Sequence, residues 1–306
     1  MDPLQMSHRA RSRLGATTRT SQSAPSLACK NTTEPAPKLG KPRGPLVEPK
    51  GVANGRISPS SDVAPWIEHY WWVRWDVAEP QVAEVLSYPS VHVTFEAKTA
   101  LIVGVVRKKF TRRLVGRGEV FALKFHPGMF RPWFGAPVVR LTDQSPPLGG
   151  QLGVPPKQLL REVFAEGDVI SRAKVLEAHL RAQLPPPDAE AELARDLVER
   201  VRTERDLKSV AALARASGLG ARALQRLFRD YVGVGPKWVL RRFRLQEAAE
   251  LLATTDQGVG AVAAALDYFD QAHFVRDFKA VVGEAPSEYV RRVRGTSESR
   301  AAWKSR

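Results

Sequence analysis

Three polar side chains that can recognise bases lie on one face of an expected helix in the last third of the chain. Arg222, Gln225 and Arg226 share this face, because successive residues of a helix are turned by about 100°. An Arg side chain donates two parallel hydrogen bonds to guanine, and Gln pairs with adenine, both in the major groove. The spacing therefore predicts a helix that contacts the bases of double-stranded DNA.

A second expected helix, fifty residues further along the chain, carries a similar polar face. Gln271 and Arg276 lie on it and offer the same hydrogen-bonding groups. Basic residues near the helix flanks are expected to bind DNA phosphates, which set the register of a protein on the duplex but carry no sequence information. The candidate phosphate contacts are Arg229, Lys237, Arg241 and Lys279.

Both helices belong to a pattern that occurs twice with identical internal spacing. The first copy contains Arg226, Phe228, Val232, Gly233 and Pro236, and the second contains Arg276, Phe278, Val282, Gly283 and Pro286. Two consecutive copies of one short pattern indicate a duplicated structural unit. The Gly is expected to end a helix and the Pro to begin the next one.

Each copy is expected to fold as a helix, a turn and a second helix. The turns lie at 218–220 in the first copy, which covers 209–233, and near 267–269 in the second, which covers about 259–282. Apolar residues at helical spacing define the buried faces. These faces comprise Leu224, Leu227, Phe228 and Tyr231 in the first copy and Phe274, Phe278 and Val281 in the second.

The two units are joined by residues 237–253, which predict one long helix whose apolar side chains pack onto both. A helix-turn-helix unit places its second helix in the major groove, and two joined units reach successive grooves about 34 Å apart. Such a protein works by binding. We therefore expect no catalytic residues, no cofactor and no enzymatic activity.

The composition agrees with a polyanionic partner. The 306 residues carry a formal net charge of +15, and the isoelectric point is about 10.3. Residues 1–60 and 205–306 each contribute +7, whereas 61–204 are close to neutral. The basic ends are therefore the parts expected to meet nucleic acid. Basic ends that serve solubility alone are the alternative.

The only cysteine, Cys29, excludes an intramolecular disulfide and any zinc site with several cysteines. A single cysteine agrees with a reducing compartment. The sequence has no secretion signal and no apolar run of the roughly 18 residues that cross a membrane. We expect a cytoplasmic protein without a membrane partner.

Residues 1–60 are rich in Ser, Thr, Pro and Arg and predict a disordered basic tail. Such a tail fits a DNA-scanning arm, a start codon placed too early or an organellar transit segment. Residues 61–150 instead predict strands, because apolar and polar residues alternate. Ile67, Trp71, Val73 and Trp75 share one phase, and a similar alternation covers 91–96 and 121–126. The expected structure is a small antiparallel barrel or sandwich.

Residues 151–204 predict a helical connector, in which Asp188 can cap a helix. The helix-turn-helix domain follows at 205–294, and 295–306 predict a basic flexible tail. The fold class is α+β multidomain: a β-rich barrel or sandwich, then an all-α domain with two helix-turn-helix motifs joined by a long helix.

Residues 205–294 resemble the DNA-binding domain of AraC/XylS-type bacterial transcriptional regulators. The segments that carry the resemblance are SVAALARASGLGARALQRLFRDYVGVGP, RRFRLQEAAELL and VGAVAAALDYFDQAHFVRDFKAVVGEAPSEYVRR. The resemblance implies two helix-turn-helix motifs joined by a long helix. It implies base contacts from Arg222, Gln225 and Arg226, and from Gln271, His273 and Arg276.

The chain departs from the family pattern at two turns. Gly220 stands where a Ser usually caps the first recognition helix, and 267–268 are Asp-Tyr where the family usually has Gly-Phe. Replacing a hydroxyl cap by Gly costs a few tenths of a kcal/mol. Asp tolerates the left-handed conformation, so the second turn is expected to survive.

The segments HYWWVRWD and KFHPGMFRPWFG resemble a β-rich domain that precedes this module in some family members, where it would be a sensor or oligomerisation domain. The candidate partners beside DNA are RNA polymerase, a small-molecule effector in the N-terminal domain and a second copy of the chain. A non-specific basic nucleic-acid binder is one rival interpretation.

A metal- or ligand-dependent enzyme in the β region is the other rival, and it would use His69, His92 and His126. Their spacing matches no paired ligand motif, so we predict no metal. The β region also concentrates aromatic side chains, which either line an effector pocket or, as we favour, fill the core. They are Trp66, Tyr70, Trp71, Trp72, Trp75, Phe130, Trp133 and Phe134.

Overall fold

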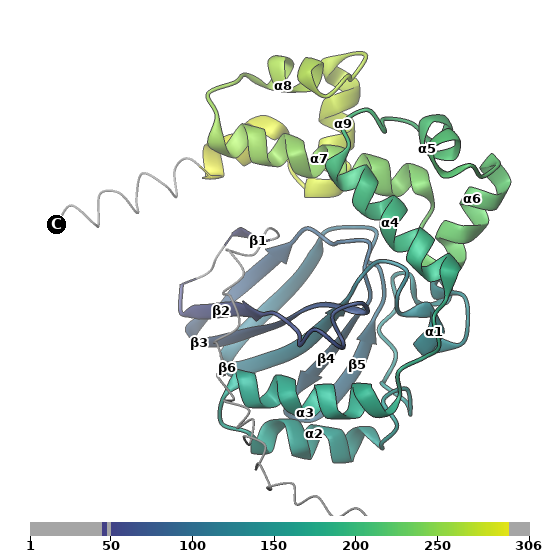
Figure 1. The fold of residues 1–306 in the computed structure, drawn as a ribbon. Coiled ribbons are helices and arrows are strands. Elements are labelled where there is room, and N and C mark those ends of the chain that lie inside the picture. Colours follow the sequence, from purple (N-terminus) through teal and green to yellow (C-terminus); the bar gives the residue numbers. More distant parts are fainter. Residues whose placement is uncertain (1–44, 48–49, 294–306) are drawn as a thin grey trace, which may run out of the picture. The chain divides into compact units, whose positions relative to one another are not determined.

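The computed structural model describes residues 45–47 and 50–293 (Figure 1). The predicted tail at 295–306 and most of the tail predicted at 1–60 lie outside the described residues. All the described residues belong to one compact unit. Within its described part, a β-rich region precedes a helical region, as the sequence predicted.

The β-rich region is a single antiparallel sheet. Its strands pair in the order β1-β3-β6-β4-β5, and β2 also pairs with β3. This path does not close, so the predicted barrel or sandwich is an open sheet. The strands are β1 (Pro45–Val47), β2 (Val52–Ile57), β3 (Ile67–Val85), β4 (His92–Glu96), β5 (Thr99–Val103) and β6 (Phe110–Phe125).

The boundary predicted near residue 60 is too late for the first two strands. The β2 sequence, VANGRI, contains Asn and Gly, which are depleted in strands. It forms a strand nevertheless, because all six of its residues pair with β3, from Val52 opposite Trp75 to Ile57 opposite Tyr70. Tertiary pairing thus overrides a weak local preference.

Strand β3 changes face near its start. The register shifts between Ile67 and His69, so one residue is inserted relative to β6. Ile67 consequently lies in the same core as Tyr70, not on the face of Trp71 and Trp75. The predicted phase is correct from Trp71 onward and wrong for Ile67.

One face of the sheet is covered by two helices, α2 (Pro156–Ala165) and α3 (Val169–Ala182) (Figure 1). Leu159 and Leu176 of these helices are fully buried together with Phe121 and Leu123 of β6. The short helix α1 (Arg131–Phe134) and the three-ten turn η1 (Val138–Leu141) contribute to the same core. The helices predicted as a connector therefore complete the core of the β region.

The aromatic side chains divide between the two faces. Tyr70, Phe130 and Trp133 are buried in the core beneath α2 and α3, and Trp66, Trp72 and Phe134 pack against it. The favoured interpretation as core residues holds for these six. Trp75 belongs to a separate cluster on the opposite face, and Trp71 packs against that cluster.

The helical region contains both predicted helix-turn-helix units and the long helix between them. Asp188 caps α4 as predicted, because its carboxylate accepts hydrogen bonds from the N–H groups of Glu190 and Ala191. The helices are α4 (Ala189–Thr203), α5 (Val210–Ser217), α6 (Ala221–Leu227), η2 (a π-helical turn, Phe228–Val232), α7 (Pro236–Thr254), α8 (Val259–Ala265) and α9 (Gln271–Val282). Residues 286–293 are also helical.

The long helix α7 is shared by two hydrophobic clusters. Its Val239 and Leu240 pack in the first unit with Phe228 and Leu224. Its Leu245 and Leu252 pack in the second unit with Phe274 and Phe278. Each half of one helix therefore belongs to a different unit. None of the helices among the described residues is both long enough and apolar enough to span a membrane.

Candidate nucleic-acid interface and ligand pocket

The first recognition helix, α6, begins directly after the turn of the first unit. Ser209 caps α5 by accepting a hydrogen bond from the N–H of Ala212 (3.1 Å), and Gly218 ends α5 in the left-handed conformation (φ 69°). Gly220 precedes α6 in an extended conformation, and no side chain caps this helix. The absence of the usual hydroxyl cap, noted in the sequence, is thus a feature of the folded turn.

Packing aims the polar face of α6 outward. Leu224 and Leu227 are buried, so the side chains on the opposite face lie in solvent. All four predicted DNA contacts of this unit are exposed, and none has an ion-pair or hydrogen-bond partner among the described side chains. They are Arg222, Gln225, Arg226 and Arg229.

The second recognition helix, α9, is capped by a side chain. Asp270 accepts a hydrogen bond from the N–H of His273 (2.6 Å). The preceding turn contains Asp267 in the left-handed conformation (φ 55°), as the sequence required. Buried Tyr268 packs edge-on against Phe274, with ring centroids 5.1 Å apart, and thereby holds the turn against the helix.

The predicted DNA-contact side chains of the second unit differ in whether neighbouring side chains hold them. Gln271, Arg276 and Lys279 are exposed, and Arg276 and Lys279 have no ion-pair partner within the described chain. His273 is held more closely. Its ring lies edge-on to Tyr268 at 5.4 Å, and its Nε2 is 3.7 Å from a carboxylate oxygen of Asp277.

The two predicted phosphate contacts on α7 also differ. Lys237 is exposed at the start of the helix. Arg241 forms an ion pair with Asp277 of α9, with Nη2 and Oδ1 3.2 Å apart. The guanidinium of Arg241 therefore links the long helix to the second recognition helix.

Sequence reasoning did not single out Phe269 as a surface residue. Its side chain is 96% exposed, the highest value among the large apolar residues described as exposed. It stands in the turn immediately before Asp270, beside Asp267, which pairs with Lys208. The sequence signal that could have identified it is its position between residues 267–268, which depart from the family pattern, and the helix cap Asp270.

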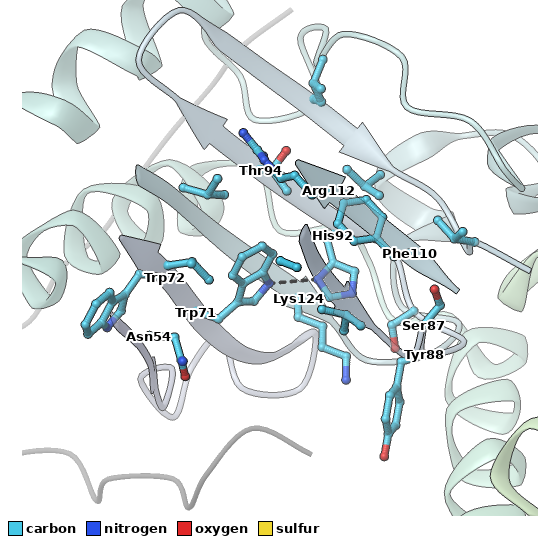
Figure 2. Close-up of a pocket in the computed structure, with 18 of the residues that line it drawn as sticks. Asn54, Trp71, Trp72, Ser87, Tyr88, His92, Thr94, Phe110, Arg112 and Lys124 are labelled. Carbon is cyan, nitrogen blue, oxygen red and sulfur yellow. Dashed lines mark hydrogen bonds between the residues drawn. The ribbon is translucent and has the colours of Figure 1, made fainter. Parts of the chain in front are cut away.

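A cavity of about 350 Å³ lies on the sheet face opposite α2 and α3 (Figure 2). Alternating residues of the sheet form its floor, because successive side chains of a strand point to opposite faces. The walls come from β2 and from the far ends of β3 and β6. Aromatic and aliphatic residues dominate the lining, among them Trp71, Val73, Trp75, Leu101, Phe110 and Leu114.

The centre of the cavity contains a hydrogen-bonded pair of rings. The indole Nε1 of Trp71 donates to Nδ1 of His92, at 3.0 Å, and Figure 2 shows the two side chains pointing toward one another. Trp71 of β3 and Thr94 of β4 both pair with Ala122 of β6. Strand β6 thus lies between β3 and β4, and its small residue Ala122 stands between the two strands whose aromatic rings meet.

The three histidines considered as metal ligands do not share one site. His69 and His92 pair with opposite sides of Lys124 in the sheet and line the cavity, whereas His126 lines a different hollow. Burial lowers the pKa of His92 to about 3, and the positive charge of Lys124 adds to this effect. Within the described residues, no group of three or more His, Cys, Asp or Glu side chains could hold a metal ion.

The cavity adjoins the long helix through residues 87 and 88, both of which line it. The carbonyl oxygen of Ser87 accepts a hydrogen bond from Nε of buried Arg242 (2.6 Å). The ring of Tyr88 lies edge-on to Phe243, at 5.6 Å. Residues 87 and 88 therefore connect the lining of the cavity directly to α7.

Two family models match the chain. Residues 213–292 match a helix-turn-helix domain, and residues 55–147 match a domain of unknown function (DUF6597). The first match covers the second helix of each unit and α7. The second covers the sheet and the cavity from β2 onward.

The relatives are transcriptional regulators. The chain is 35% identical over 83 residues to an uncharacterised HTH-type transcriptional regulator of Haemophilus influenzae, covering 27% of this chain and 26% of that protein. It is 35% identical over 81 residues to the HTH-type transcriptional regulator GlxA of Rhizobium meliloti, covering 26% of this chain and 25% of that one. For the HTH-type transcriptional activator AarP of Providencia stuartii, the values are 39% over 77 residues, 25% and 57%. The chain thus spans about a quarter of the length of the first two relatives.

Solved structures align over larger parts of the chain at lower identity. ToxT from Vibrio cholerae aligns with a TM-score of 0.35 and 9% identity, covering 79% of this chain and 98% of that one. The C-terminal domain of AraT, a response regulator from Geobacillus stearothermophilus, aligns with a TM-score of 0.31 and 23% identity, covering 34% and 88%.

Proposed function

We propose that this protein is an AraC-type transcriptional regulator that binds a specific DNA sequence through both units, since residues 213–292 match a helix-turn-helix domain. One observation carries the proposal. Each unit turns a polar helix face outward while the opposite face is buried against one half of α7. A single rigid helix thereby holds two DNA-reading helices.

We assign the base contacts to exposed residues of the recognition helices. Arg222, Gln225 and Arg226 of α6 and Gln271 and Arg276 of α9 have the geometry and chemistry for bases in the major groove. His273 is included as a contact whose position is set by Tyr268 and Asp277.

The phosphate contacts are assigned to Arg229, Lys237 and Lys279, with Arg241 orienting α9 through Asp277 in addition. Phe269, exposed beside the second recognition helix, lies at the edge of the proposed interface. The basic residues would bring positive charges to the DNA phosphates on both sides of the recognition helices.

The proposal includes regulation by a small molecule bound in the cavity of the β region. The supporting contacts are those of residues 87 and 88, which line the cavity and touch Arg242 and Phe243 of α7. We further propose the domain limits predicted from the sequence, with the start of the β region moved to residue 45. A cytoplasmic location, a homodimer and contact with RNA polymerase complete the working proposal.

Selection of DNA sites from a random library, with the full-length protein at physiological salt, tests this function. We expect an enriched motif with two short blocks about one helical turn apart. Salt-dependent binding without any enriched motif would contradict sequence-specific reading and favour a general nucleic-acid binder. The selection is repeated with the double variant Arg226→Ala, Arg276→Ala, which should lose its preference at one base pair of each block.

A further inference from the structure

The charged side chains that line the cavity of the β region are already engaged. Each charged side chain in its lining already has a partner. Arg112 makes two hydrogen bonds to Glu96 (2.6 and 2.8 Å), Lys124 pairs with Glu68 (2.9 Å), and Lys109 bonds Glu84 (2.6 Å). Arg56, which also lines the cavity, has an interaction partner as well. A charged ligand would therefore lose its hydration without gaining an unpaired counter-ion.

The hydrogen-bonding groups left in the lining can serve a neutral ligand. Since Nδ1 of His92 accepts a hydrogen bond from Trp71, the proton of the neutral ring resides on Nε2. The pKa of His92, lowered to about 3 by burial, keeps the ring neutral near pH 7. Nε2–H has no partner among the described residues, so the ring presents one donor.

A second group points to the same chemistry. Ser90 lines the cavity and is only 2% exposed, and its hydroxyl has no hydrogen-bond partner among the described residues. A buried hydroxyl without a partner is costly, and both Ser90 and His92, two residues apart in the chain, line the cavity. The lining thus offers hydrogen-bond donors within an aromatic enclosure.

We propose that this cavity binds a neutral, largely apolar molecule of one or two rings that presents a carbonyl or ether oxygen to His92 and Ser90. A volume of about 350 Å³ lies at the small end of the range for ligand sites. Trp71, Trp75 and Phe110 supply the ring contacts. The inference specifies the class of the effector and in that respect rests on the proposed function.

Three probes of equal heavy-atom count separate the ligand classes. They are 4-phenylbutan-2-one, a ketone; 3-phenylpropanoate, a carboxylate; and (3-methylbutyl)benzene, which lacks an oxygen. Calorimetry or ligand-observed NMR on the full chain at pH 7.5 measures their affinities. We expect the ketone to bind at least tenfold more tightly than the carboxylate and severalfold more tightly than the hydrocarbon. Equal or tighter binding of the carboxylate, or no binding by any probe, would overturn the proposal.

Two variants test the oxygen site. The double variant Trp71→Phe, His92→Leu removes the imidazole donor without freeing the indole N–H that His92 accepts from, and Ser90→Ala removes the hydroxyl with little change in volume. Each should reduce the preference for the ketone over the hydrocarbon by several-fold, and His126→Leu, outside this cavity, should leave it unchanged. A preference that survives both substitutions in folded protein would contradict the assignment.

DNA binding is measured separately, so that the two proposals fail separately. Selective binding of the ketone without recognition of a DNA motif would support the neutral-ligand site and refute the proposed regulatory function. Selection of a DNA motif together with equal affinities for the ketone and the carboxylate would support the proposed regulatory function and refute the neutral-ligand site.

Discussion

The two helix-turn-helix units share one sequence pattern but differ in how firmly their reading side chains are held. In the first, Arg222, Gln225 and Arg226 have no partner among the described residues. In the second, Arg276 is likewise unpaired, but the ring of His273 contacts Tyr268 and Asp277, and Asp277 also binds Arg241. Free arginines lose side-chain entropy when they bind, whereas held residues have lost it already.

The comparison suggests a division of labour. Under the proposed function, the first unit would bring to the DNA arginines that no neighbouring side chain holds. The second unit presents a more fixed surface, in which an aspartate caps the helix and an ion pair ties it to α7. A duplicated fold therefore does not imply duplicated energetics.

The largest expected effects test whether the units are separate cores. Phe228→Ala and Phe278→Ala each remove a fully buried ring and should lower the free energy of unfolding by about 3–5 kcal/mol. Because Phe228 and Phe278 belong to different clusters, hydrogen exchange should increase mainly in the substituted unit. An equal increase in both units would show that they open as one.

Base contacts should show the asymmetry between the units. Arg226→Ala should weaken binding to the selected site by about 1–3 kcal/mol and relax preference at one base pair. His273→Ala should cost less, because an imidazole cannot form the two parallel hydrogen bonds that the Arg226 guanidinium can donate to a guanine. Titrations with labelled DNA measure both. The control Arg202→Ala removes a charge that is paired with Glu199 on α4. Equal losses for Arg226→Ala and His273→Ala would refute the asymmetry.

The cap of the second recognition helix should matter for stability. Asp270→Ala removes the acceptor for the N–H of His273 and should cost about 1 kcal/mol of unfolding free energy. Urea unfolding gives the value, and Asp270→Ser, which restores a capping oxygen, is the matched control. No loss for the alanine variant would mean that the turn is held by Tyr268 alone.

The smallest effect is expected at the corresponding position of the first unit. Gly220→Ser introduces a capping hydroxyl where the backbone is already extended and a Cβ would meet no atom within 4 Å. We expect a gain of only a few tenths of a kcal/mol, because Gly is itself an acceptable cap. An increase in unfolding free energy as large as the decrease caused by Asp270→Ala would show that the missing cap destabilises the first unit by about 1 kcal/mol.

The helical region was predictable because its pattern is local. The apolar positions of α6, α7 and α9 follow one helical period, and Gly233 and Gly283 end helices in the left-handed conformation. The π-helical turn at 228–232 was not predicted, since its residues fit an ordinary helix equally well. The ion pair of Arg241 with Asp277 was also hidden, because it joins residues of two helices.

The β region was predictable in kind but not in detail. Alternation identified strands, yet the shift after Ile67 and the pairing of β2 depend on partners distant in sequence. The same is true of the cavity. Trp71 and His92 were both noted in the sequence, but only the register of β3, β6 and β4 brings them together.

The shared helix α7 makes the protein intolerant of insertions at one place. Its 19 residues span about 28 Å at about 1.5 Å per residue. One inserted residue in its middle would turn the second unit by about 100° relative to the first, and an insertion of about seven or eleven residues would be needed to nearly restore the phase. Under the proposed function, the distance between the two half-motifs in the DNA would therefore be fixed by the length of α7, which point substitutions cannot change.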